Sequence, residues 1–595
     1  MRRLIILCAL AVVVATSSRP VGCAEPPAVD RLLTNSTALY GEFSRPQELI
    51  DLVLSDKARQ LADQFPAVAK YWESKDFRTL KTVVEVLERR LGVEWRTAIE
   101  TLTAGGVTAA FDTSEQAAFL FVRSGDAELL AKLHDALVEM TEADAENKGR
   151  ESPIKSEDYR GFTGWTFGKN EAHVLLGDLL VVSNKAEALK GVADRYLAAA
   201  ENDAKESDEK SASLADDAVY RAARKHAAGN DAGFAFVRLA PLRLLAGMAK
   251  ALGQKSNNAL LELLLGGALD AVSQADYLAA TLQLNEQGLR FAAHLPRDRA
   301  KVAPTRTWFF ADKPNQSAEI ALDVPGTIAT LTAHRDVGGM WQARSDLFDE
   351  QTNVGFTKAD TNLGLYFSGK DFGSQVLGEL EPKWRIIAAE RKFGVDGEPT
   401  PALKLPSFAV VWELKHPLEF APHLQLAFQN VVGLTNVDGA QKGRAQLLLK
   451  SEQRGDAEIH YGTYLRVGET DQDNAPVQFN FRPACARVGK HFIVGSHVDL
   501  VRTLADQLGK QPSTPTTSDS FALEIRAQEL ATILAANRPL IVGRRMLAAG
   551  GDKPAAEGQL ELGLEALRLF EDAGIRLIDG ADSLTLELRL QTASN

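Results

Sequence analysis

The sequence predicts an α+β fold made of two tandem repeats, in which mainly antiparallel sheets are flanked by helices, with the helices expected on one face. Short strand-like runs alternate with amphipathic helical stretches along the 595 residues. The motif "GDLLVVS" at Gly177 returns as "GKHFIVGS" at Gly489, and a helical stretch follows each copy. The other segments recur in the same order around these two motifs. A repeat of roughly 300 residues is far longer than a solenoid or propeller repeat, so each copy is predicted to be a domain-sized unit.

The predicted parts are a signal peptide (1–24), a first repeat (25–299) and a second repeat (300–595). The signal peptide is indicated by Arg2 and Arg3, by an apolar run over residues 4–15 and by small residues that end at Ala24. We therefore expect a periplasmic or extracellular protein whose mature chain begins at Glu25.

Attachment to a membrane by a lipid is the alternative. "PVGC" ahead of Ala24 partly resembles the motif at which Cys23 would be acylated. Pro20 stands where that motif usually has leucine, so the sequence favours cleavage without lipid.

The elements of the first repeat follow from periodicity and capping residues. Ser44 and Pro46 are typical of a helix start, and Leu129, Leu130, Leu133, Leu137 and Met140 would share one helix face. In order, the sequence predicts a strand at 37–43, a helix from 44, helical structure over 79–102, strands from 106 and 117, a helix from 126, strands around 159–167 and 172–183, a helix after 184, a strand from 232 and a hairpin over 276–295.

The second repeat shows the same order. Residues 372–393 correspond to 91–112, residues 407–428 to 117–138, and residues 520–536 to 232–248, and a hairpin over 575–591 ends the chain. In this alignment Trp95 and Trp384 would lie in corresponding helices as core residues, and superposition would bring Gly177 onto Gly489 and Ala117 onto Phe408.

Two local predictions complete the fold. "LLVVS" and "FIVGS" should be interior strands that turn into helices at Ser183 and Gly495. The polar or proline-rich stretches 200–218, 394–406 and 509–519 should be surface loops.

Composition limits the classes of function. The formal net charge is −12, which argues against nucleic acid as a partner because phosphate binding needs a basic surface. After the signal peptide no apolar stretch reaches the length of about 20 residues that a membrane span needs. Cys485 is the one cysteine beyond residue 24, so we expect stability to come from packed cores without an internal disulfide.

Several of these segments together resemble an uncharacterised domain family of secreted bacterial proteins of the planctomycete type. The resemblance rests on a T-x-x-Y strand (37–40), a strand pair (106–122), an aromatic-glycine strand (159–165) and the G-x-h-h-h-h-x-S strand (177–183), which is repeated at 489. It covers most of residues 31–300 and, more weakly, 370–510, although "LTNSTALY" lacks the Pro and Asp that often precede the first strand. The resemblance implies export and a tandem duplication but no activity.

No short catalytic, nucleotide-binding or zinc-protease motif occurs in the sequence. His416, Glu419 and His423 are the closest cluster of possible metal ligands, but Pro417 and Pro422 favour a capped helix start over a zinc site. His491 and His497 flank a strand and are expected to be exposed or half-buried. The acidic stretch 469–476 offers oxygens that could bind calcium weakly, but it lacks the glycine and the distal glutamate of an EF-hand loop, so we expect a solvated hairpin tip. We assign no catalytic, cofactor-binding or metal-ligating residue and expect no cofactor.

The sequence therefore favours an exported, non-catalytic binding or structural protein over an enzyme, with an unknown protein or small molecule as its ligand. A first alternative is a hydrolase whose residues converge from distant segments, which would place a histidine, a carboxylate and a nucleophile together. A second is a carrier of apolar ligands, which would need a contiguous cavity lined by the apolar faces of the strands.

Overall fold

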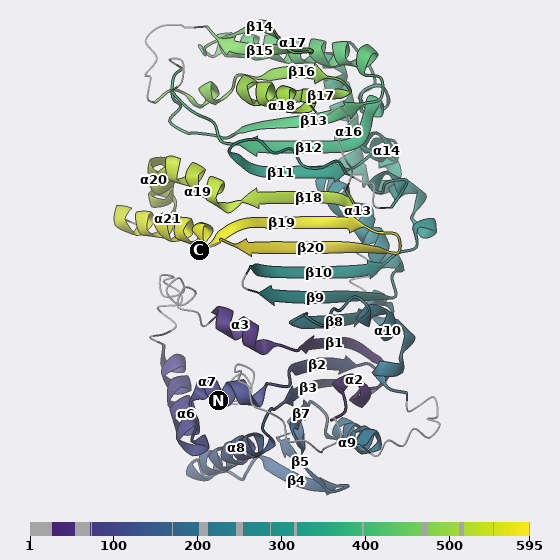
Figure 1. Cartoon of the computed structure of the whole chain (residues 1–595), viewed down its shortest axis with the longest axis vertical. Coiled ribbons are helices and arrows are strands. Elements are labelled where there is room, and N and C mark those ends of the chain that lie inside the picture. The colour runs from purple at the N-terminus through teal and green to yellow at the C-terminus, as the bar shows by residue number, and fades with distance from the viewer. Residues whose placement is uncertain are drawn as a thin grey trace. The chain divides into compact units, whose positions relative to one another are not determined.

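The structure, a computed structural model, describes residues 26–53, 72, 74–168, 171–200, 212–244, 254–285, 287–314, 318–394, 398–465, 474–510, 517–550 and 552–593 (Figure 1). The predicted signal peptide and cleavage site, residues 1–25, lie outside this described part. The chain divides into two compact units, residues 1–245 with 275–294 and residues 246–274 with 295–595. Each combines helices with an antiparallel sheet, so the α+β prediction is confirmed.

In the first unit the strand order is β4-β5-β6-β7-β3-β2-β1-β8-β9-β10. The strands are β1 (Thr37–Phe43), β2 (Val107–Asp112), β3 (Ala117–Arg123), β4 (Ile154–Tyr159), β5 (Phe162–Phe167), β6 (Glu171–Leu176), β7 (Leu179–Ser183), β8 (Gly233–Arg238), β9 (Tyr277–Asn285) and β10 (Gly288–Pro296). The helices are α2 (Val29–Leu32), α3 (Pro46–Val53), α6 (Lys75–Leu91), α7 (Trp95–Leu102), α8 (Ala127–Asn147), α9 (Ala186–Ala200), α10 (Ala218–Arg224) and α11 (Leu239–Arg243).

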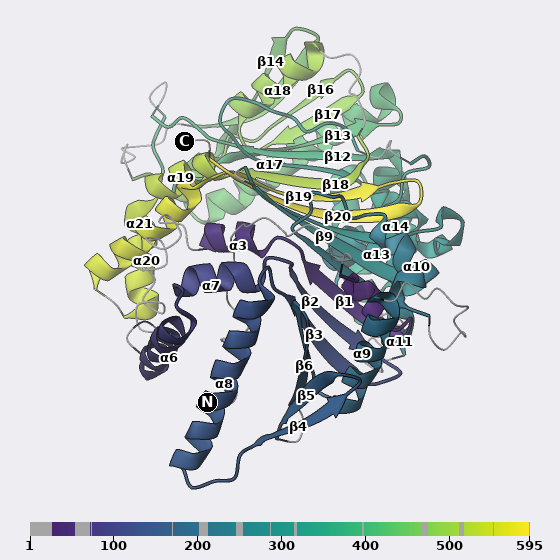
Figure 2. The same cartoon turned by 60° about the horizontal axis from the view of Figure 1, so that its bottom comes forward.

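Helices cover both faces of this sheet, whereas the sequence led us to expect one (Figure 2). On one face α2, α9 and α10 close a core with side chains such as Phe121, Val181 and Phe236. On the other face lie α6, α7 and α8. Asp126 caps α8 by accepting hydrogen bonds from the backbone N–H groups of the first turn. Gly92, at φ 70°, ends α6 and lets the chain reverse into α7.

The second unit has the strand order β14-β15-β16-β17-β13-β12-β11-β18-β19-β20. Its strands are β11 (Thr327–His334), β12 (Leu380–Ala389), β13 (Ser407–Leu414), β14 (Leu447–Arg454), β15 (Ala457–Tyr464), β16 (Ala484–Val488), β17 (His491–Gly495), β18 (Asp519–Arg526), β19 (Phe570–Asp579) and β20 (Ser583–Thr592). Its helices are α13 (Ala259–Gln274), α14 (Val337–Gln342), α15 (Arg344–Leu347), α16 (Glu350–Gly364), α17 (Pro417–Gln441), α18 (Val498–Lys510), α19 (Ala527–Ala536), α20 (Arg538–Ala549) and α21 (Lys553–Arg568).

This second sheet is also covered on both faces. The apolar side of α18 packs on alternate residues of β13, β16 and β17. On the opposite face α17 packs with α14 and α16 around Phe420, Phe428 and Phe492. Cys485 is buried in that second layer, where burial raises the pKa of its thiol to about 12.

The two strand orders follow the same pattern, and the pairing registers agree in detail. The pairing of β1 with β2 shifts just after Thr37, and that of β11 with β12 shifts just after Thr327. Gly177 and Gly489 both adopt positive φ angles, each two residues before the first residue of β7 or β17. "LLVVS" and "FIVGS" lie in interior strands, each between two partners, as predicted.

The registers correct one predicted equivalence. Phe119 lies opposite Ser183, and Ala409 lies opposite Gly495, so Ala117 corresponds to Ser407. The predicted partner, Phe408, is one residue further along and is exposed, whereas Ala117 and Ser407 are both buried. A shift of one residue exchanges the two faces of a strand.

Trp384 was also misassigned. Trp95 lies in α7, but Trp384 lies in β12, paired on both sides by β11 and β13. Its ring packs edge-on against Trp412, with 5.9 Å between the centroids. The two tryptophans therefore do not occupy corresponding helices.

The position of α13 differs from the predicted boundary at residue 299/300. This helix precedes β9 in the chain but packs within the second unit. Its Glu262 carboxylate accepts a hydrogen bond from Arg306 at 2.7 Å. Gly267 lies against the ring of Phe309, leaving no room for a Cβ atom. Among the residues that the structure describes, no helix is both long and apolar enough to cross a membrane.

Candidate functional site

The first unit contains an apolar cavity of about 250 Å³ between its sheet and helices α6, α7 and α8. Figure 2 shows α8 facing β3 and β6, on the side of the sheet away from α9. Apolar side chains from these three helices and from β3, β6 and β7 form most of its wall, including Val84, Leu87, Ile99, Leu120, Val122, Leu133, Leu137, Leu175, Leu180 and Val182.

Strand alternation explains this lining. Successive side chains of a strand point to opposite faces, so Leu179 and Val181 enter the core under α9 while Leu180 and Val182 border the cavity. The leucine face of α8 completes the wall. Leu129 and Leu130 are buried in the cluster with α7, and Leu130, Leu133 and Leu137 border the cavity.

A pair of histidines forms the polar part of this wall. His134 of α8 and His173 of β6 are joined by a hydrogen bond of 2.9 Å between their Nε2 atoms. The Trp165 ring packs against both imidazoles. Burial, assisted by the neighbouring His134, lowers the pKa of His173 to about 4, so its ring is neutral at pH 7.

The hydroxyl of Thr103 is a second polar group in the wall. Thr103 is buried, and its Oγ1 has no hydrogen-bond partner among the described residues. A buried hydroxyl without a partner costs free energy, so a ligand atom that accepts or donates a hydrogen bond there would be stabilised.

The second unit fills the equivalent space with larger side chains. Val122 lies opposite Leu180 in the first sheet, and the matching pair in the second sheet is Trp412 opposite Phe492. Cys485 corresponds to His173. His173 lies opposite Val182 of β7, and Cys485 lies opposite the equivalent residue of β17, Val494. Phe492 is fully buried in the layer under α17. One face of the fold thus surrounds a cavity in the first unit and a packed core in the second.

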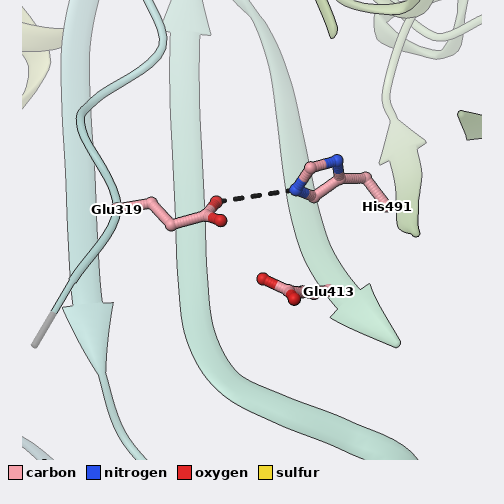
Figure 3. Close-up of side chains that lie close together, drawn as sticks. All are labelled: Glu319, Glu413 and His491. Carbon is pink, nitrogen blue, oxygen red and sulfur yellow. Dashed lines mark ion pairs between the residues drawn. The ribbon is translucent and has the colours of Figure 1, made fainter. Parts of the chain in front are cut away.

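A buried charged cluster in the second unit is the other candidate site. Glu319, Glu413 and His491 lie close enough together to hold a metal ion (Figure 3). His491 Nε2 lies 3.6 Å from the Glu319 carboxylate, the ion pair drawn dashed in that figure.

Cations already surround both carboxylates of this cluster. Arg385 lies 2.9 Å from Glu319, and Lys383 and Lys490 both pair with Glu413. Burial favours the neutral acid, but the neighbouring imidazole of His491 and the charge of Arg385 prevail and lower the pKa of Glu319. With three basic side chains facing two carboxylates, the cluster fits a buried ion-pair network better than a metal centre.

The residues singled out in the sequence are not brought together. His416 precedes α17 and pairs with Glu379 at 2.8 Å, not with Glu419 or His423. Pro417 is the first residue of α17, and Pro422 lies within the same helix instead of breaking it. Residues 469–473 lie outside the described part of the chain.

His491 and His497 were predicted wrongly as exposed or half-buried, because both are buried. The Glu319 side chain that faces His491 comes from a segment 172 residues earlier, which local periodicity does not reveal. The cavity residues were not assigned either. The leucine face of α8 and the alternation of β7 can be recognised in the sequence. They predict a buried face, but they do not predict whether a cavity remains beside it.

Comparisons with known proteins do not assign the chain to a family. No model of a protein family matches the sequence, and no curated protein matches it. Among solved structures, crystal form I of TP0453 is 11% identical and has a TM-score of 0.22, with 47% of this chain and 82% of that chain covered. Crystal forms III and IV are 9% identical, each with a TM-score of 0.22; form III covers 47% of this chain and 83% of its own, and form IV covers 46% and 81%. Similarity at this level supports no argument about fold or function.

Proposed function

We propose that this protein binds an elongated apolar ligand, such as an acyl chain, in the cavity of its first unit, without catalysis. The observation that carries the proposal is the cavity of about 250 Å³ with an almost entirely apolar wall. Of the functions compatible with the sequence, an apolar-ligand carrier is the one that requires such a space.

The chemistry of the wall favours a hydrocarbon chain over a polar metabolite. Each methylene group transferred from water to an apolar wall contributes about 0.8 kcal/mol, so a chain of several carbons would bind measurably. The His134–His173 pair and the Thr103 hydroxyl offer a place for one polar group at the end of such a chain. Pockets of this kind combine an apolar body with few polar contacts.

The hydrolase alternative finds less support. His134 bonds to Asp135 at 3.1 Å and to His173, and neither ring bonds to a serine, threonine or cysteine within the described residues. A nucleophile would have to lie within hydrogen-bond reach of its base.

The wider setting of the proposal is an exported protein built by duplication. The pattern of residues 1–24 supports export, with a lipid on Cys23 as the alternative. The equal strand orders and matching register shifts support duplication of one unit. On this view one copy keeps a binding cavity and the other has become a packed counterpart. Membership of the uncharacterised secreted family stays a prediction.

The test is a binding titration with a fluorescent long-chain fatty acid. Leu180→Phe combined with Val122→Trp gives the first unit the two large side chains of the second, and we expect saturable binding by the natural protein and its loss in this variant. Leu418→Phe with Val437→Trp is the matched control, because both residues are exposed on α17. Binding that survives the cavity-filling pair, or fails in the natural protein, contradicts the proposal. Leu180→Phe alone serves if the pair does not fold.

A further inference from the structure

A second cavity, of about 460 Å³, lies in the second unit where β17 turns into α18. Its wall combines apolar side chains with charged or polar ones, which include Arg391, Arg482, Arg502, His497 and Glu398. Arg391 follows β12, and His497 immediately precedes α18. None of these residues belongs to the apolar cavity or to the cluster around Glu319.

Three nitrogen atoms in this wall have no hydrogen-bond partner among the described residues: Arg391 Nε, Arg482 Nε and His497 Nε2. His497 Nδ1 lies 3.3 Å from the backbone N–H of Asp499, from which it accepts when the ring proton is on Nε2, and 3.4 Å from the Asp499 carboxylate. Both guanidinium Nε atoms are donors, and His497 Nε2 is a donor in that tautomer. The side chains of Arg391 and His497 are only 5% and 2% exposed. Buried donors without acceptors are costly, so an acceptor that reached these atoms would be stabilised.

The charges of this cavity also favour an acceptor that is an anion. Glu398 is the carboxylate that pairs with both Arg391 and Arg482. Arg502 is bound by Glu452 and Asp499, while Glu390 and Lys392 are exposed and opposite in charge. One buried guanidinium group, that of Arg391, and one half-buried group, that of Arg482, thus share one carboxylate, which also lies 4.0 Å from His497 Nε2. The N-terminus of α18, which begins at Val498, adds partial positive charge on the same side.

The first unit carries its own anion at the equivalent place. Asp112 lies opposite Thr37 across β2 and β1, and the matching pair in the second unit is Ala389 opposite Thr327. The Asp112 carboxylate accepts hydrogen bonds from the backbone N–H groups of Ser114 and Glu115, at 2.9 and 3.0 Å. Ala389 borders the second-unit cavity and supplies no such group.

We propose that this cavity binds a small oxyanion, a phosphate or carboxylate group, in the position that the Asp112 carboxylate occupies in the first unit. Its oxygens would accept from Arg391 Nε, Arg482 Nε and His497 Nε2. Hydrogen bonds from the two charged guanidinium groups would be about twice as strong as those between neutral groups. The site is separate from the apolar cavity and does not depend on the function proposed for it.

Isothermal titration of the full mature chain at low ionic strength tests this site, with inorganic phosphate, acetate and glycerol 3-phosphate as separate probes. We expect saturable binding of at least one probe. Tighter binding of glycerol 3-phosphate than of phosphate would assign the site to a headgroup, and the reverse order would assign it to the free ion.

Two variants and one control decide the outcome. Ala389→Asp restores the carboxylate of the first unit, and Arg391→Gln removes a donor; we expect each to weaken binding by about tenfold or more. Ala389→Asp should also keep the thermal midpoint of the ligand-free protein at or above that of the natural protein, so this variant decides the matter if Arg391→Gln does not fold. Arg454→Gln, in the exposed pair with Asp506, should bind like the natural protein. No saturable binding by the natural protein, or equal binding by Ala389→Asp, overturns the proposal.

Discussion

Val122 of β3 lies directly opposite Leu180 of β7, and both side chains border the apolar cavity of the first unit. In the second unit the same cross-strand pair is Trp412 and Phe492, and the space is packed. The difference between the two units therefore depends on a few side chains on one face of an otherwise similar sheet.

This relationship predicts opposite effects on stability when Leu180 and Phe492 are each replaced by the other's residue type. Phe492→Leu should lower the free energy of unfolding by about 1 to 2 kcal/mol, because it removes buried carbon atoms from a close-packed layer. Leu180→Phe should leave that free energy unchanged or raise it, since the added atoms enter existing space. Urea denaturation of both variants measures the two changes. A destabilised Leu180→Phe beside a neutral Phe492→Leu would contradict the assignment of cavity and core.

The pKa of His173 predicts a loss of stability in mild acid. Its value of about 4 lies below the ordinary 6.5, so the unfolded chain takes up a proton first as the pH falls. The stabilisation is complete above pH 6.5 and is lost between pH 6.5 and 4, at most about 3 kcal/mol. His173→Gln does not titrate and should lose less stability than the natural protein between pH 7.5 and 4.5 in urea denaturation. Equal losses would show that His173 is not the group responsible.

The buried ion pair between Arg385 and Glu319 should matter far more than a surface pair. Both side chains are 2% exposed, so Arg385→Met leaves a carboxylate buried with less compensation, at an expected cost of about 3 to 5 kcal/mol. Arg454→Met, which breaks the exposed pair with Asp506, should cost under about 1 kcal/mol. Thermal and urea unfolding measure both.

Metal titration tests whether the cluster of Glu319, Glu413 and His491 binds a metal ion. Because basic side chains already compensate Glu319 and Glu413, added Zn²⁺ should leave the thermal midpoint unchanged. A midpoint that rises with Zn²⁺ and returns with chelator, and that no longer responds in His491→Gln, would establish a metal centre instead.

The intact mass of the exported protein tests the predicted processing. We expect an unmodified chain that begins at Glu25, because the small residues before it suit cleavage and Pro20 disfavours the lipid motif. Cys485 would then be the single thiol, unreactive until the protein unfolds because it is buried. A chain that begins at a diacylated Cys23 would establish the lipid-anchored alternative.

Much of the fold could be predicted from the sequence because it depends on local patterns. Glycine, an apolar run and a helix start mark β7 and β17, and Asp126 marks the start of α8. The order of segments alone predicts a helix at Trp384, whereas pairing with β11 and β13 decides its conformation. Burial of His491 depends on a distant partner, and so could not be read locally.

The cavity could not be predicted from the sequence, for a different reason. An apolar helix face looks the same in sequence whether it touches the sheet or stands away from it. The decisive information is the size of side chains on neighbouring strands, Leu180 against Phe492 and Val122 against Trp412, and this becomes visible only when the registers are known.

The central claim is that the apolar ligand lies between the sheet and helices α6–α8 of the first unit. Photo-crosslinking with a long-chain fatty acid that carries a diazirine near its methyl end, followed by peptide mapping, tests it most directly. We expect labelled peptides from α6, α7, α8 and β6–β7, with labelling suppressed by unlabelled fatty acid and by Leu180→Phe. Labelling confined to the second unit, or not suppressed by competitor, would contradict the claim.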